Sequence, residues 1–368
     1  MNSKERIRSI LAGEPADRMG KADAPWPHTR ERWRREGAPN DVHVNDHFAM
    51  DIRRMVVCNG SLMLEDETLD ENEDATVVRN ADATVMKIWK DQHASPGPVE
   101  FGIRSRADWE KYRERLVPSD DRYRLGYYGD YQYEYDAMTP SRIAEQFAAQ
   151  ETLRETFVPV SISDPYEATM ARCGDERLLK WMIDDPDLVT EMFDAHAELG
   201  IGMLKRLLDA GAKPDGIFCG GDVAYKNGPQ ISPRMYRRLL KPYHKKMFDF
   251  YRECGLKIIY HSDGDVRELL GDLIDAGIDC IEPLEFQAGM DLDELAEPFG
   301  KRVSFMGNLS AIRMSGTRDQ AVADARRCLR AGRKLRGYIL HSDHSVPPTV
   351  SWENFQAIME VFDEEAHR

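Results

Sequence analysis

The stretch LKIIYHSDGDVRELLGDLIDAGIDCIEPLE, residues 256–285, contains one repeating unit of the chain and decides the fold. Its first run, 256–260, is apolar and rich in isoleucine, which favours a buried strand. Apolar residues then recur at helical spacing as far as Gly277, a residue typical of the position just beyond a helix. A second apolar run, 278–282, follows. A strand, a helix and a strand in this order predict two parallel strands joined by a crossover helix.

The same unit recurs from about residue 150 to the end of the chain. Amphipathic helices separate six apolar runs, which predict strands at 156–163, 216–221, 256–260, 278–282, 302–306 and 337–340. Upstream, DIRRMVV (51–57) and TVMKIWK (84–90) are candidates for two further strands. Eight strands predict an α/β fold of the (β/α)8 TIM-barrel type, and a doubly wound open sheet is the alternative.

The part of the chain before residue 151 is less regular. We expect 1–150 to hold an irregular N-terminal extension and the first barrel units, and 151–368 to hold the regular βα units. The acidic segment 65–91 has the turns and short apolar runs that are typical of antiparallel strands. Because no Gly/Ser-rich linker divides the chain, residues 1–368 are predicted to form a single barrel domain.

The composition argues against several classes of partner. A formal net charge of −15 disfavours nucleic acid and anionic membranes, which need a basic face for their phosphates. No run approaches the roughly 18 apolar residues of a membrane span, and the charged N-terminus does not resemble a secretory signal. The six cysteines are scattered without a CxxC pair, which is typical of reduced thiols. We therefore expect a cytoplasmic enzyme with no nucleic-acid or membrane partner.

Polar or ionisable side chains follow each predicted strand at its carboxyl end. In a parallel barrel these ends meet on one face, where ligands bind. A single aspartate after a strand can equally cap the next helix, as we expect of Asp265. Six strands with this feature nevertheless predict a shared site. The residues are Asp164, Asp222, His261, Asp263, Glu282, Glu285, Asn308, His341, Asp343 and His344.

His261, Asp263 and His344 form a candidate three-ligand zinc set. Side chains two residues apart on a strand face the same way, so His261 and Asp263 can point to one centre. Two imidazoles and one carboxylate leave a fourth position open for a substrate, as in catalytic zinc sites. The alternative is a metal-free polar mouth that binds a carboxylated ligand. Because the mouth is rich in Asp and Glu, a metal, a cation or a neutral ether fits it better than a polyanion.

Four longer motifs carry a family resemblance: GGDVAYKNGPQISPRMYRRLLKPYHKK (220–246), HSDG (261–264), FMGNLS (305–310) and ILHSDHSVPPTVSWEN (339–354). With these motifs the chain resembles the uroporphyrinogen decarboxylase superfamily over essentially its whole length. The resemblance implies a (β/α)8 barrel. It also implies one of two activities, which are cofactor-free decarboxylation of porphyrinogens and zinc-dependent methyl exchange with a corrinoid (vitamin B12-type) protein.

The decarboxylases of this superfamily hold substrate carboxylates with an Arg-Gln-Ala-Gly-Arg loop. The corresponding segment here, DAPWPHTRERWRREG (23–37), has its arginines at helical spacing and lacks the loop glycine. The decarboxylases' active-site tyrosine would fall near Ala171. Asp51, in HFAMDI, matches the family's Phe-x-x-Asp, and His344 matches its late histidine. The resemblance therefore keeps decarboxylation of a tetrapyrrole acid as the alternative function, with Asp51 bound to pyrrole NH groups and His344 to a carboxylate.

The methyltransferases that use coenzyme M carry His-x-Cys-Gly and a later cysteine as zinc ligands. These positions match 261–264 and His344, so His261 is retained while Asp263 and His344 replace the two thiolates. Both replacements can bind zinc, and they make the ligand set harder. The N-terminal region and ILHSDHSVPP resemble the O-demethylase type more closely, which takes a methyl group from an ether or a similar donor.

The function predicted from these observations is corrinoid-dependent methyl transfer. Zinc on the three predicted ligands is expected to activate the heteroatom of a small methylated substrate, a methyl ether. The chain has no Asp-x-His-x-x-Gly cobalamin-binding segment, so we expect a partner corrinoid protein to supply the corrinoid (cobalamin). A third hypothesis is a non-catalytic binder of small polar ligands. Further catalytic candidates are Asp222, Glu285, His341, Asp343 and Asp51, and candidates for the substrate pocket are Tyr166, Tyr225 and Asn308.

Overall fold

Eight parallel strands form the barrel in the computed structural model, which describes residues 1–40, 42–90, 97–127 and 136–367. Neighbouring strands pair in the order β1-β16-β15-β14-β13-β10-β9-β2. The two ends of this run are joined at Asp51, whose N–H donates to the Lys21 carbonyl at 2.8 Å. The strands are β1 (Gly20–Lys21), β2 (Met55–Cys58), β9 (Pro159–Ser163), β10 (Gly216–Gly220), β13 (Lys257–His261), β14 (Cys280–Glu282), β15 (Ser304–Met306) and β16 (Tyr338–Leu340).

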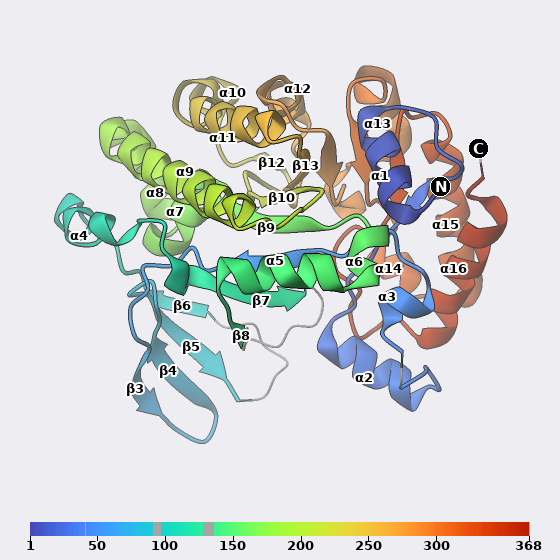
Figure 1. The fold of residues 1–368 in the computed structure, drawn as a ribbon, viewed down its shortest axis with the longest axis horizontal. Coiled ribbons are helices and arrows are strands. Elements are labelled where there is room, and N and C mark those ends of the chain that lie inside the picture. The colour runs from blue at the N-terminus through green and yellow to red at the C-terminus, as the bar shows by residue number, and fades with distance from the viewer. Residues whose placement is uncertain (41, 91–96, 128–135, 368) are drawn as a thin grey trace.

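Helices follow these strands and surround the barrel (Figure 1). Among the described residues, none of them is both long and apolar enough to cross a membrane. The helices before β9 are α1 (Ser3–Ala12), α2 (Pro27–Arg35), α3 (Val44–His47), α4 (Arg106–Tyr112), α5 (Pro140–Ala149) and α6 (Glu151–Glu155). Those after β9 are α7 (Pro165–Cys173), α8 (Asp175–Asp184), α9 (Pro186–Asp209), α10 (Pro233–Met235), α11 (Lys241–Glu253), α12 (Arg267–Ala276), α13 (Leu292–Phe299), α14 (Ala311–Met314), α15 (Arg318–Gly332) and α16 (Trp352–Glu365).

The six strands predicted after residue 150 are confirmed, and so is DIRRMVV, which contains β2. The prediction that TVMKIWK is a barrel strand is wrong. Its strand β5 (Val85–Trp89) lies in a separate antiparallel sheet of order β3-β4-β5-β6, which projects at the lower left of Figure 1. The eighth barrel strand is instead β1, whose two residues are too few to show any hydrophobic period. The other strands of that sheet are β3 (Glu67–Glu71), β4 (Ala75–Arg79) and β6 (Gly97–Glu100).

Two antiparallel strands extend the barrel sheet beyond β2, and a separate two-stranded hairpin follows β10. Strand β7 (Tyr123–Tyr127) pairs antiparallel with β2, and β8 (Asp136–Ala137) pairs with β7. Between β10 and β13, β11 (Ala224–Tyr225) and β12 (Gly228–Pro229) form a small hairpin. This hairpin follows the carboxyl end of β10, so it stands beside the mouth of the barrel.

Helix α1 closes the amino end of the barrel. Its Ile7, Ile10 and Leu11 pack with apolar residues from the barrel interior, such as Phe157 and Ile259. The Ser304 hydroxyl at the start of β15 donates to the Ile10 carbonyl at 2.8 Å, which fixes the helix against the strand ends. With this end filled by apolar side chains, polar residues are left at the carboxyl end, where ligands bind in this type of barrel.

Candidate active site

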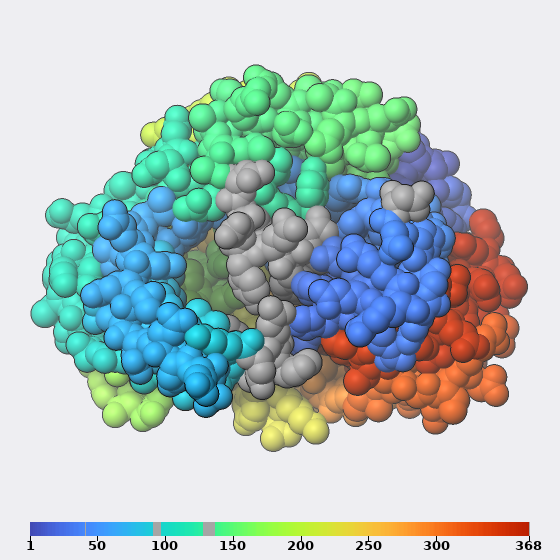
Figure 2. Space-filling model, turned by 90° about the horizontal axis from the view of Figure 1, so that it is seen from below, coloured from blue at the N-terminus to red at the C-terminus, as the bar shows by residue number. Residues whose placement is uncertain are grey.

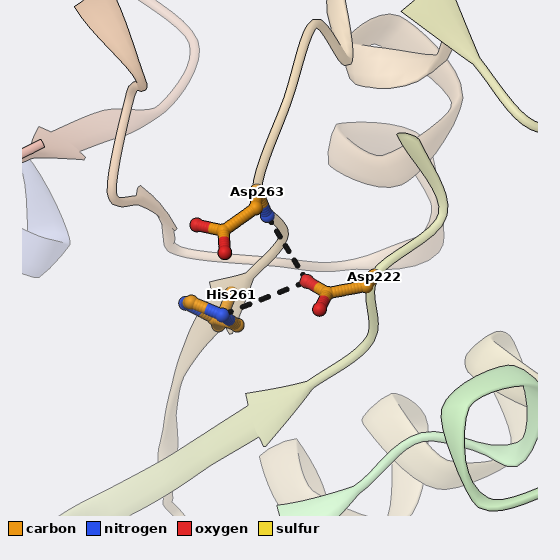
Figure 3. A group of neighbouring side chains, drawn as sticks. All are labelled: Asp222, His261 and Asp263. Atoms are coloured by element: carbon orange, nitrogen blue, oxygen red, sulfur yellow. Dashed lines mark hydrogen bonds and ion pairs between the residues drawn. The ribbon is translucent and has the colours of Figure 1, made fainter. Parts of the chain in front are cut away.

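Three of the strand-end residues converge at the carboxyl end of the barrel. His261 ends β13, Asp263 lies two residues beyond it, and Asp222 lies two residues beyond β10. Atoms of these side chains that can bind a metal all lie within 4.8 Å of one another. Figure 3 shows the three side chains pointing toward one another, and His261 Nε2 lies 3.6 Å from Asp222 Oδ1. We call Asp222, His261 and Asp263 the Asp–His–Asp group.

The backbone around Asp263 is held in place by its neighbours. The N–H of Asp263 donates to Asp222 Oδ1 at 3.0 Å, and the N–H of Gly264 donates to Glu285 Oε2 at 3.0 Å. Gly264 has a φ of +81°, and a Cβ there would lie 2.6 Å from the backbone of Tyr225. Only glycine fits this turn without strain. The predicted residue Glu285 therefore orients the turn that carries Asp263.

His261 has one ring nitrogen fixed by a carboxylate. Its Nδ1 lies 2.5 Å from Glu282 Oε2, so Nδ1–H donates to Glu282 and Nε2 faces Asp222. Burial alone would lower the pKa of His261, but the negative charge and hydrogen bond of Glu282, with the charges of Asp263 and Asp222, raise it to about 10. Glu282 responds in the opposite direction: its pKa is lowered by His261 although burial opposes this. The site therefore favours positive charge at its centre.

The donor atoms of the Asp–His–Asp group fit a divalent metal such as zinc. Oδ1 of Asp263 is buried and has no hydrogen-bond partner among the described residues. Burial, assisted by the charge of Asp222, raises the pKa of Asp263, because this carboxylate lacks sufficient compensating charge. Imidazole nitrogen and carboxylate oxygen are both zinc ligands, and a ligating imidazole commonly has its second nitrogen held by a carboxylate, as Glu282 holds His261.

His344, the third zinc ligand predicted from the sequence, lies next to this group. Its Nε2 is 3.6 Å from Asp263 Oδ2, while its Nδ1 accepts the N–H of Ser345 at 2.8 Å. A neutral imidazole has one donor and one acceptor nitrogen, so Nε2 carries the proton and faces Asp263 as a donor. The structure thus brings His344 to Asp263, but it is Asp222 that completes the three-residue group.

Comparison with known proteins gives the family. Residues 166–365, more than half of the chain, match the family model described as uroporphyrinogen decarboxylase (URO-D). The chain belongs to the uroporphyrinogen decarboxylase family. Curated relatives named uroporphyrinogen decarboxylase include one from Streptomyces avermitilis, 29% identical over 274 residues (72% of this chain, 68% of the relative). Another, from Streptomyces griseus subsp. griseus, is 27% identical over 337 residues (89% of this chain, 85% of the relative).

A solved structure extends the comparison to the whole fold. A methyltransferase from Methanosarcina mazei matches with a TM-score of 0.68 and 19% identity, over 99% of each chain. At this identity the likeness establishes the fold, and it confirms the TIM-type barrel that the sequence predicted. The chain is therefore a barrel of the uroporphyrinogen decarboxylase family, a family of enzymes, and it shares its fold with a methyltransferase.

In this family member, His341 and Asp23 extend the polar interior at the mouth of the barrel. Nδ1 of the predicted residue His341 lies 3.8 Å from Glu282 Oε1, and its Nε2 lies 3.8 Å from Asp23 Oδ1. Burial raises the pKa of Asp23, although the charge of His341 opposes this shift. Glu282 was among the strand-end residues predicted to share a site, without an assigned role, and Asp23 was not predicted. Glu282 was visible as a strand-end residue, whereas Asp23 follows the two-residue strand β1 and had no signal.

Four predicted residues lie outside the Asp–His–Asp group. Asn308 is buried with a φ of +74°, and its Nδ2 donates to the Leu284 carbonyl at 3.0 Å, so it fixes two loops. Tyr166 is buried on α7, with its hydroxyl 3.1 Å from Gln230. Tyr225 is 53% exposed on the β11–β12 hairpin, where its backbone packs against Gly264. Asp51 lies at the β1–β2 junction, fully buried among cationic partners.

Asp343 also has a partner other than the Asp–His–Asp group. Its Oδ1 accepts the N–H of Ala311, the first residue of α14, at 2.8 Å. Burial, followed by the charges of Glu285 and Asp324, raises its pKa to about 6 against the pull of two backbone hydrogen bonds. Asp343 therefore supports the start of α14.

Replacing Asp343 with asparagine is expected to change the pH dependence of stability. The folded-state pKa of about 6 lies above the ordinary 3.8, so the proton stabilises the fold at low pH, and this stability is lost as pH rises through 6. Asparagine can still accept the Ala311 N–H and cannot ionise, so the variant should gain about 2–3 kcal/mol relative to wild type between acidic and neutral pH. Urea unfolding of both proteins across this pH range measures the difference. If the free energy of unfolding depends on pH in the same way for both proteins, the raised pKa of Asp343 is contradicted.

Proposed function

We propose that this member of the uroporphyrinogen decarboxylase family is a methyltransferase that moves a methyl group from a small methyl ether to a corrinoid protein. The observation that carries the proposal is the Asp–His–Asp group, with its convergent donor atoms and the buried Oδ1 of Asp263, which has no hydrogen-bond partner in the described part of the chain. We propose that these three residues hold zinc. When bound, zinc would act as a Lewis acid on the ether oxygen and so improve it as a leaving group.

The chain's own residues would prepare this site before any ligand binds. Glu282 holds the His261 ring so that Nε2 faces Asp222, and Glu285 holds the turn that carries Asp263. The Asp263 N–H holds Asp222 in turn. Supporting contacts of this kind keep ligand atoms in position and so increase metal affinity. The same carboxylates give the mouth a negative potential, which suits a neutral ether better than a substrate with several carboxylates.

The names of the curated relatives favour a second candidate, decarboxylation of a tetrapyrrole acid without metal. That candidate assigned Asp51 to the substrate's pyrrole NH groups. Asp51 is 0% exposed, and its carboxylate lies 2.8 Å from both Arg6 and Arg18. These contacts already occupy the carboxylate and leave it no access to a ligand. The structure therefore supports methyl transfer more than decarboxylation.

The proposed function is tested by following methyl transfer directly. The zinc-loaded chain is mixed with reduced cob(I)alamin, free and bound to a corrinoid carrier protein, and with a panel of methyl ethers, methylamines and methyl thioethers. We expect the corrinoid absorbance to report methylation with at least one ether, and the rate to fall to background in His261→Ala. His28→Ala, on the surface helix α2, is the matched control and should keep the wild-type rate.

Two outcomes would overturn this assignment. Absence of methylation with every donor in the panel contradicts methyl transfer. Release of carbon dioxide from a porphyrinogen by the metal-free chain, lost in Asp51→Asn, would favour the decarboxylase instead.

A further inference from the structure

A second cavity lies at the amino end of the barrel, away from the Asp–His–Asp group. Its volume is about 310 Å³, at the lower end of the range of small-molecule sites. It lies where α1, α11 and α12 end and where β13 and β14 begin. Helices α1 and α12 are in the upper part of Figure 1. Figure 2 looks from below onto another side of the molecule, which is hollowed between the light-blue sheet β3–β6 and the darker blue helices α2 and α3.

Four cations and one carboxylate line this second cavity, which we call the basic cavity. The cations are Arg252, Lys257, Arg302 and Arg336, the carboxylate is Asp279, and the other lining residues are uncharged. Lys257 Nζ lies 3.1 Å from Asp279 Oδ1, and Arg302 Nη2 lies 3.0 Å from Oδ1 of Asp275, which is outside the cavity. With both pairs set aside, two arginines remain on the cavity wall. In a chain with a formal net charge of −15, such a concentration of positive charge is a local exception that attracts anions.

A further carboxylate at this end of the barrel has cations of its own. Asp215 precedes β10, and its carbonyl accepts the N–H of Lys257 at 3.3 Å. Its carboxylate lies 3.2 Å from Lys4 Nζ and 2.7 Å from Arg8 Nη2, both on α1. Asp215 therefore does not offset the charge of the basic cavity.

Arg252 borders the basic cavity without an ion pair. Among the described residues, no carboxylate pairs with its guanidinium. Its side chain lies across Gly277, where a Cβ would be 3.1 Å from Nη1 and 3.5 Å from Cδ. The glycine that follows α12 thus leaves room for this arginine. The end of a helix carries only about half a negative charge, so it attracts Arg252 without neutralising it.

Arg336 is held at the cavity wall by backbone carbonyls. Its Nη2 donates to the Leu11 carbonyl near the end of α1 at 3.0 Å, and its Nη1 donates to the Arg302 carbonyl at 3.2 Å. A Cβ on Gly13 would lie 2.6 Å from its Nε, so the glycine that follows α1 leaves room for this side chain as well. A guanidinium fixed in this way is ordered before a ligand binds, which lowers the entropic cost of binding.

We propose that the basic cavity binds a small anion that carries two or more phosphate or carboxylate groups. Guanidinium groups form paired hydrogen bonds with the oxygens of both kinds of group. An anion with a single charge would leave most of the positive charge of the cavity uncompensated. The apolar lining residues, Ala12, Ile274 and Ile278, offer little surface to an apolar ligand. This binding site is separate from the candidate active site and does not rest on the proposed function.

Calorimetric titration with inorganic pyrophosphate, citrate and acetate tests the site. The full chain is used with no metal added, because pyrophosphate and citrate also bind divalent metals. One pyrophosphate or citrate should bind per chain, more tightly than acetate, and the tighter of the two shows whether phosphate or carboxylate groups are preferred. Arg252→Gln should weaken this binding at least about 10-fold, the size expected for lost charge-assisted hydrogen bonds. Arg252→Lys keeps the charge without the planar fork and should bind with intermediate affinity.

Arg234→Gln is the matched control. Arg234 lies on α10, is exposed like Arg252, and its replacement removes the same charge, so this variant should bind the anions like the wild type. Because Arg252 has no ion pair, Arg252→Gln should also match the wild type in urea unfolding, and weaker binding can then be assigned to the lost charge.

Three outcomes would each overturn the basic cavity as a binding site. They are the absence of saturable binding of pyrophosphate and citrate, unchanged binding in Arg252→Gln, and equal weakening in Arg234→Gln. Failure of zinc binding or of methyl transfer would contradict only the proposed function, because this titration uses neither.

Discussion

Replacing Asp222 with asparagine is expected to lower zinc affinity by at least about 100-fold, because loss of a ligand should exceed the 10- to 100-fold effect typical of residues that only support ligands. His261→Ala should have an effect of the same size. His344→Ala should still bind one zinc per chain, with affinity reduced only about 10-fold, since Nε2 of His344 faces the carboxylate of Asp263. Competition with a coloured chelator and elemental analysis measure affinity and stoichiometry.

The order of these effects decides which residues hold the metal. If the ligands were His261, Asp263 and His344, as the sequence alone suggested, His344→Ala would lose zinc and Asp222→Asn would retain it. The surface variant His28→Ala is the control for zinc lost during purification, and its zinc affinity and stoichiometry should match those of the wild type. An undetectable level of zinc in the wild-type protein after metal loading would contradict the metal site itself.

The barrel could be predicted from sequence where each unit carries its full pattern. Strand β13, helix α12 and Gly277 repeat a combination that recurs through the second half of the chain, so the six strands there were found. The first strand, Gly20–Lys21, is two residues long and shows no period. The run 84–90 has the composition of a strand, but composition does not say which sheet a strand joins. Its hydrogen bonds are with β4 and β6.

The candidate site could be predicted only in part, because a sequence pattern marks strand ends but does not show which side chains meet in the folded chain. His261 and Asp263 were found because they stand at and just after a strand end, which topology brings to the mouth. That Asp222 completes the group depends on how the loop after β10 places its carboxylate beside His261 and Asp263, and this placement has no sequence signal. Asp51 matched a motif, but the match does not tell which end of the barrel the residue occupies.

Asp51→Ala is expected to destabilise the fold by about 3–5 kcal/mol, the cost of breaking a buried ion pair by removing one partner. Its carboxylate accepts hydrogen bonds from Arg6 and Arg18, and from the N–H of Lys21 at 2.9 Å, which joins β1 to the segment before β2. Without it, the little-exposed guanidinium of Arg18 loses its carboxylate partner, Arg6 keeps only Asp17, and the joint between β1 and β2 loses a hydrogen bond. Urea unfolding of the wild type and the variant measures the loss.

Asp209→Ala is the control for this prediction. Asp209 also pairs with a cation, with 2.7 Å between its Oδ2 and Lys205 Nζ, but both side chains are 64% exposed. An ion pair of this kind contributes at most about 1 kcal/mol, so the control should unfold close to the wild type. If Asp51→Ala is instead as stable as the wild type and loses turnover, Asp51 acts on a substrate. The decarboxylase alternative would then regain its principal residue, because the buried contacts with Arg6 and Arg18 would no longer account for its presence.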